Sequence, residues 1–135
     1  MEKEPIFLTL DDVLAIHANQ LELYGGSSGL RDRDALLSAL EAPRWAFHYG
    51  QADIVDLAAV YFYHLMMNHP FVDGNKRVGT AATFVFFDFQ GYWVEIPDEK
   101  LEELALQVAG GQLDKEKVAP RLRPFVVTPQ AGDLS

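Results

Sequence analysis

The chain has 135 residues, a length typical of one domain with a sizeable hydrophobic core. Its 20 acidic and 11 basic residues give a net charge of −9, which argues against direct binding to nucleic acid or an anionic membrane and favours a basic peptide as partner. The absence of cysteine excludes disulfides, thiol nucleophiles and thiolate metal sites. No apolar stretch is long enough to span a membrane and the N-terminus has no signal-like apolar region, so we expect a cytoplasmic protein.

The first predicted helix covers residues 10–24. Apolar residues recur there with helical spacing, Thr9 is a suitable N-cap, and Gly25 marks the end. His17 falls on or near the apolar stripe, and we interpret it as a partly buried, hydrogen-bonded residue rather than a catalytic one. The glycines and serines of residues 25–29 then predict a flexible loop.

A second helix is predicted from about Asp32 and is expected to end before Pro43, because proline removes a helical hydrogen bond. The following residues 44–50 lack helical periodicity and are rich in aromatic side chains. Taken alone, this segment is a connector whose rings could pad the core.

Two longer apolar segments follow. Residues 53–68 are apolar on most sides and predict a central, buried helix. After a short polar loop, a fourth helix is expected to begin near Asn75 or Lys76 and to run to about Gln90, with Gly91 just beyond its end.

The C-terminal third is less regular. Residues 92–96 form a short extended run, too isolated to imply a sheet by itself, and a fifth helix is expected over residues 98–109. A sixth helix opens at Asp114, but Pro120 falls in its interior, so we expect it to be kinked or to end early. Residues 125–135 are predicted to be an irregular tail.

The loop between the third and fourth helices has the highest concentration of residues able to transfer protons or to bind metal or phosphate. Gly74 lets the main chain approach a ligand, and Lys76 and Arg77 add positive charge at a helix N-terminus, which suits an anion. Asp73 is a hard oxygen ligand suited to Mg²⁺, and His69 could accept a proton from an attacking hydroxyl. Turn formation and capping would explain any one of these residues, but not their coincidence, which indicates phosphoryl or nucleotidyl transfer.

This loop resembles the signature of the Fic/Doc family, His-x-Phe-x-(Asp/Glu)-(Gly/Ala)-Asn-(Gly/Lys)-Arg. Lys76 at the variable eighth position, and Thr80 where adenylylating members carry a second arginine, are similar to the Doc (death-on-curing) toxins. The resemblance implies an all-α fold: a compact helical bundle of about six helices over residues 1–124, with a short flap loop or hairpin over the active site. Six positions match the signature: His69, Phe71, Asp73, Gly74, Asn75 and Arg77.

The resemblance also assigns roles to the loop residues. His69 would be the general base, Asp73 the Mg²⁺ ligand and Phe71 an apolar anchor of the motif. The flap of such proteins lies across the active site and guides the target, so residues 44–50 become its candidate. The nucleotide- and phosphate-binding group, in which the first two residues shape the turn and the last two hold phosphates, comprises Gly74, Asn75, Lys76 and Arg77; possible flap contacts to the target are Phe47, His48 and Tyr49.

The function implied is that of a Doc-like toxin, a kinase that uses ATP and Mg²⁺ to phosphorylate a hydroxyl of a translation factor of the elongation factor Tu class and so inhibits translation. A cognate antitoxin is the expected partner, since the chain lacks the Ser/Thr-x-x-x-Glu-(Gly/Asn) pattern of an internal inhibitory helix. One alternative is a Fic-type protein adenylyltransferase, against which Lys76 and Thr80 count. Another is a non-catalytic binding module with this fold, against which His69 and Asp73 count.

Overall fold

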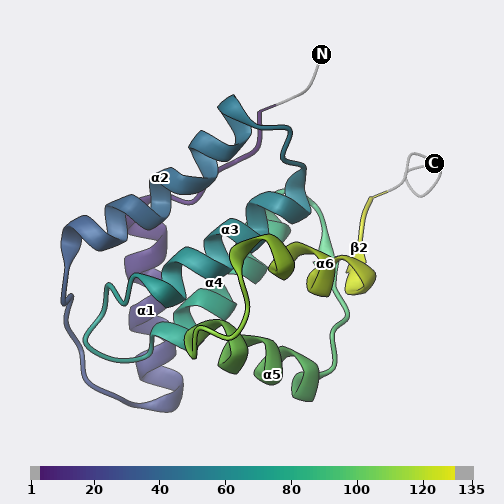
Figure 1. Ribbon diagram of the computed structural model, residues 1–135. Helices are drawn as coiled ribbons and strands as arrows, with labels where there is room; N and C mark the ends of the chain where they lie inside the picture. Colours follow the sequence, from purple (N-terminus) through teal and green to yellow (C-terminus); the bar gives the residue numbers. More distant parts are fainter. Residues whose placement is uncertain (1–3, 130–135) are drawn as a thin grey trace.

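The computed structural model describes residues 4–129, which form a helical bundle (Figure 1). The all-α expectation is confirmed, since the described residues hold six α-helices and one small two-stranded sheet. No helix in this part of the chain has both the length and the apolar character needed to cross a membrane. The α-helices are α1 (Leu10–Tyr24), α2 (Arg33–Tyr49), α3 (Ile54–Met67), α4 (Asn75–Phe89), α5 (Asp98–Ala109) and α6 (Val118–Leu122).

Helices α3 and α4 form a central hairpin around which the other helices pack (Figure 1). Gly79 of α4 allows the two helices to approach closely, because a Cβ atom there would lie 2.9 Å from Cγ of the buried Met66 on α3. The loop joining the two helices therefore begins and ends on buried elements. The largest buried side chains of this hairpin are Tyr61, Phe62, Leu65, Met66, Phe86 and Phe87.

Capping signals in the sequence mark the observed helix starts. Thr9 and Asp53 each form a capping box with the aspartate three residues later, at the start of α1 and α3. Gly25 ends α1 with a positive φ of 78°, as predicted. These local hydrogen bonds need no tertiary contact, which explains why they could be predicted.

Helix α2 differs from the prediction, because it continues through Pro43 and ends at Tyr49. Proline inside a helix costs about 3 kcal/mol. Here that cost is offset by burial: the α2 residues packed into the core recur every three or four positions, and Pro43 is one of them. The expectation that residues 44–50 form a non-helical connector or flap is therefore wrong for residues 44–49. The buried residues of α2 are Leu36, Ala39, Leu40 and Pro43.

The C-terminal region is partly as predicted. The sixth helix is short: α6 lies between two 3₁₀ turns, η1 (Lys115–Lys117) and η2 (Arg123–Phe125). Pro120 is the third residue of α6, in the first helical turn, where a missing N–H is least costly. Helix α6 does end early, after Leu122.

The predicted irregular tail is wrong at its start. Strand β2 (Val126–Val127) pairs antiparallel with β1 (Trp93–Val94), and the Glu95 N–H donates to the Phe125 carbonyl at 2.8 Å. Each strand is too short to be recognised without its partner. Residues 130–135 of that tail lie outside the described part of the chain.

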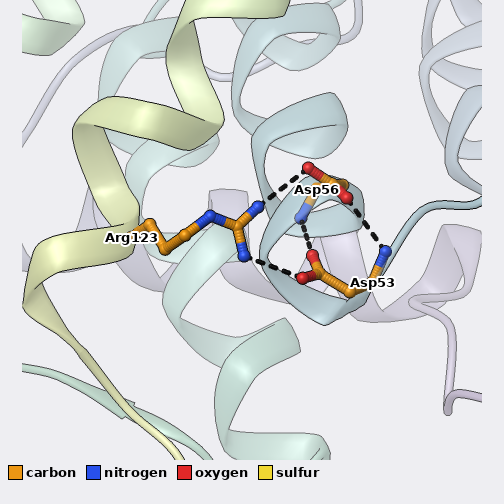
Figure 2. Close-up of polar contacts among 3 residues, drawn as sticks. All are labelled: Asp53, Asp56 and Arg123. Atoms are coloured by element: carbon orange, nitrogen blue, oxygen red, sulfur yellow. Dashed lines mark hydrogen bonds and ion pairs between the residues drawn. The ribbon is translucent and has the colours of Figure 1, made fainter.

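Arg123 joins the C-terminal region to the beginning of α3 (Figure 2). Its guanidinium donates to Asp53 Oδ2 at 2.7 Å and to Asp56 Oδ1 at 3.0 Å, the two carboxylates of the α3 capping box. Partial burial pulls the pKa of Asp53 upward, but the hydrogen bonds from Arg123 and from the Asp56 N–H outweigh it, so this pKa is lowered. This ion-pair cluster lies at the opposite end of α3 from the His69–Arg77 loop.

Candidate active site

The loop from His69 to Arg77 presents the N-terminus of α4 to solvent. Gly74 is the N-cap and has a left-handed φ of 81°, a conformation that glycine adopts without strain. The first bond of the helix runs from the Val78 N–H to the Gly74 carbonyl at 2.9 Å. The N–H groups of residues 75–77 precede that bond and therefore have no acceptor within the helix. Free N–H groups at the positive end of a helix are the kind of group that binds anions.

Two residues hold this loop from within. The side-chain amide of Asn75 accepts from the Phe71 N–H and donates to the Phe71 carbonyl, both at 3.0 Å. The Phe71 ring is only 2% exposed and stacks on the His17 ring, with centroids 3.9 Å apart and planes at 12°. In this structure Phe71 is thus a buried anchor, and the Asn75 amide is engaged with backbone.

His17 joins α1 to the same loop. Its ring is buried, and Nε2 donates to the Asp73 carbonyl at 3.0 Å. The expectation of a buried, hydrogen-bonded histidine on α1 is confirmed. Its structural task, to support the turn beneath the candidate site, could not be assigned from helical spacing alone.

The Asp73 side chain is exposed. It accepts from the Ser27 N–H at 3.1 Å and from the Gly74 N–H at 2.9 Å, and these bonds, with the nearby charge of Arg77, lower its pKa. The group is therefore ionised at neutral pH and available to a cation. No cluster of three or more His, Asp or Glu ligands occurs in residues 4–129, so a metal here would take most of its ligands from phosphate and water, as Mg²⁺ does.

The segment that lies along the loop is residues 25–31, not residues 44–50. The Val72 N–H donates to the Gly29 carbonyl at 3.1 Å, and Leu30 forms an isolated antiparallel bridge with Phe71. Gly26 allows this approach, since a Cβ there would lie 2.8 Å from Asp73 Oδ2. The glycines of residues 25–29 are the sequence signal for this contact. By themselves they predict only a flexible loop, because they do not show which segment packs against them.

The residues proposed for a flap lie elsewhere. Phe47, His48 and Tyr49 form the last turn of α2. The opposite end of this helix contacts the loop, because the N–H of its N-cap residue Asp32 donates to the Pro70 carbonyl at 3.0 Å. A helix of 17 residues is about 25 Å long, so these three side chains are at the far end from the candidate site. The structure does not bring them together with the motif residues.

Two neighbouring clefts share Lys76 and Arg77. The smaller, of about 390 Å³, is lined by the motif loop and includes His69 and Asp73. The larger, of about 560 Å³, lies between α1, α4 and α5 and is mostly apolar. The Arg77 guanidinium is held between them, since it donates to the Gly25 carbonyl at 3.2 Å and lies 5.7 Å from the ring centre of Tyr24.

The geometry defines a helical domain in which the loop between two buried helices exposes a helix N-terminus and carries a histidine, a carboxylate and two cationic side chains. Comparison with known proteins agrees: residues 7–87 match the Fic/DOC family, and the chain is 32% identical over 114 residues to Toxin Doc of Mycolicibacterium smegmatis, covering 81% of this chain and 87% of that protein. The chain therefore belongs to the Fic/DOC family, whose members are transferases.

Proposed function

We propose that this protein is the toxin of a toxin–antitoxin pair and that it transfers the terminal phosphate of ATP to a hydroxyl of a translation factor of the elongation factor Tu class, thereby arresting translation. The observation that carries the proposal is that His69, Asp73, Lys76 and Arg77 line one cleft at the free N-terminus of α4. The similarity to a protein named Toxin Doc supports the toxin role and, with it, a cognate antitoxin as partner.

Each group of residues in the cleft has a different role in the proposed reaction. The N–H groups at the start of α4, with Lys76 and Arg77, bind and orient the phosphates. Asp73 would hold Mg²⁺, which when bound neutralises charge on the phosphate oxygens. His69 takes the proton from the target hydroxyl as its oxygen bonds to the terminal phosphorus, while the bond from that phosphorus to the oxygen of ADP breaks.

The distribution of charge favours phosphate transfer over AMP transfer. Thr80 lies one turn beyond Lys76 on α4, and its neighbours in the larger cleft are Ala81 and Phe84. The positive charge that α4 contributes to the joined clefts is therefore confined to the end beside His69, so the phosphate held most firmly is the one nearest the base. Residues 25–31, whose backbone lies along the loop, are the best-placed segment to guide the target.

The test is the intact mass of purified elongation factor Tu after incubation with the protein and Mg²⁺-ATP. We expect a gain of about 80 Da, the mass of one phosphate. His69→Asn is the control of choice, because asparagine tolerates the left-handed φ of 46° found at His69 better than alanine does. The control should show no gain. A gain of an AMP-sized group would establish the adenylyltransferase alternative. A wild-type protein that neither modifies the factor nor melts at a higher temperature with Mg²⁺-ATP would contradict the proposal.

A further inference from the structure

Arg31 lies outside the motif, yet it binds three consecutive carbonyls at the junction of α3 and the loop. Its guanidinium donates from Nε to the His69 carbonyl at 2.5 Å and from Nη2 to the Asn68 carbonyl at 2.9 Å. Its backbone N–H donates to the Pro70 carbonyl at 2.8 Å. One residue thus fixes the peptide groups on both sides of the His69 side chain.

His69 needs such a restraint. Its φ of 46° makes it the one non-glycine residue among residues 4–129 with a positive φ. This left-handed conformation costs about 1–2 kcal/mol for a residue with a Cβ. The carbonyls at the end of α3 also lack N–H donors within the helix, and a guanidinium at this negative end satisfies them. The hydrogen bonds of Arg31 therefore stabilise the backbone conformation that sets the direction of the imidazole.

The junction has other anchors that do not touch the His69 carbonyl. The Asn68 side chain donates to the Ala35 carbonyl at 3.0 Å, and the Asp32 N–H shares the Pro70 carbonyl with Arg31. These bonds hold the loop to α2 when the Arg31 side chain is removed. Loss of the guanidinium should therefore loosen His69 without unfolding the domain.

We infer that Arg31 is a positioning residue, which holds the His69 imidazole in the direction required for proton transfer by fixing the carbonyls of Asn68 and His69. The inference rests on the proposed function, because it matters for the reaction only if His69 acts as the base. Misplacing a catalytic group by about 1 Å can lower the rate about 100-fold.

The kinetic test compares Arg31→Ala and Arg31→Lys with the matched control Arg33→Ala. Arg33 is also exposed at the start of α2, and within residues 4–129 its side chain has no hydrogen bond or ion pair. We expect Arg31→Ala to lower kcat by about 10- to 100-fold with KM for Mg²⁺-ATP changed less than about twofold. Added guanidinium ion should restore part of the kcat that Arg31→Ala loses. The kcat of Arg31→Lys should stay below that of the wild type, because lysine cannot bind both carbonyls in one plane. The control should retain the wild-type rate.

A second readout does not depend on activity: the ring resonances of His69 by NMR, assigned by their loss in His69→Asn. We expect them to move toward the values of an unrestrained histidine in Arg31→Ala and to stay in place in Arg33→Ala. Unchanged ring resonances would overturn the inference, and so would a raised KM with unchanged kcat, which would make Arg31 a ligand contact. If the wild-type protein transfers no phosphate but the resonances move, the proposed function fails while the positioning role stands.

Discussion

Asn75 could hold the loop together through its bonds to Phe71 or could contact the ligand directly, and replacing it separates these two roles. Its amide makes two hydrogen bonds of 3.0 Å to the backbone of Phe71, and each such bond contributes about 1 kcal/mol. Asn75→Ala should therefore lower the free energy of unfolding by about 2 kcal/mol. At about 2.1 cal/mol/K of unfolding entropy per residue, a chain of 135 residues then melts about 7 °C lower.

Asn75→Asp refines the same test. The new carboxylate can still accept from the Phe71 N–H, but its second oxygen faces the Phe71 carbonyl without a proton. Asn75→Asp should therefore lose one of the two bonds and lower the free energy of unfolding by about 1 kcal/mol, roughly half the loss expected for Asn75→Ala.

The assay is urea unfolding followed by tryptophan fluorescence, together with the shift in melting temperature caused by Mg²⁺-ATP. An Asn75→Ala variant that melts within about 1 °C of wild type and yet loses the shift caused by the nucleotide would contradict this role. In that case Asn75 would act on the ligand directly and the loop would not depend on its bonds to Phe71.

Two further predictions concern the scaffold. Tyr61→Phe leaves the buried Leu8 N–H, now 2.9 Å from the Tyr61 hydroxyl, without an acceptor and should cost about 1–3 kcal/mol in urea unfolding. Because burial raises the pKa of Tyr61 to about 12, wild-type stability should fall between about pH 10 and 12. Tyr61→Phe should remove this loss. A variant with the same alkaline stability profile as the wild type would argue against this role of Tyr61. Arg123→Gln should lower stability at pH 7 by only about 0.5–1 kcal/mol, since the pair with Asp53 is exposed. The lowered pKa of Asp53 means that this difference is present above pH 4 and vanishes at lower pH, so a constant difference down to pH 2 would contradict it.

Local chemistry determined much of what could be predicted from this chain. The caps Thr9, Asp53 and Gly25 place helix ends through hydrogen bonds and backbone angles within a few residues. The motif loop was placed correctly because its two flanking apolar segments are long enough to be recognised as helices and leave only a short polar connection.

Long-range contacts decided the rest. Pro43 stays in a helix because the core accepts its ring, and β2 exists because β1 lies beside it. Neither fact is written in the neighbouring residues, since burial and strand pairing join parts of the chain that are far apart in sequence.

The candidate site likewise combines features set by local sequence with features set by long-range contacts. Which groups meet in the loop follows from the order of residues, because His69, Asp73, Lys76 and Arg77 are neighbours along the chain. What surrounds and orients these groups depends on the tertiary fold. Residues 25–31 lie against the loop from about 40 positions away and include Arg31, whose guanidinium binds the carbonyls at the end of α3. The physical reason is that backbone carbonyls look alike in any sequence, and a side chain that binds them acquires its role only when the fold brings it there.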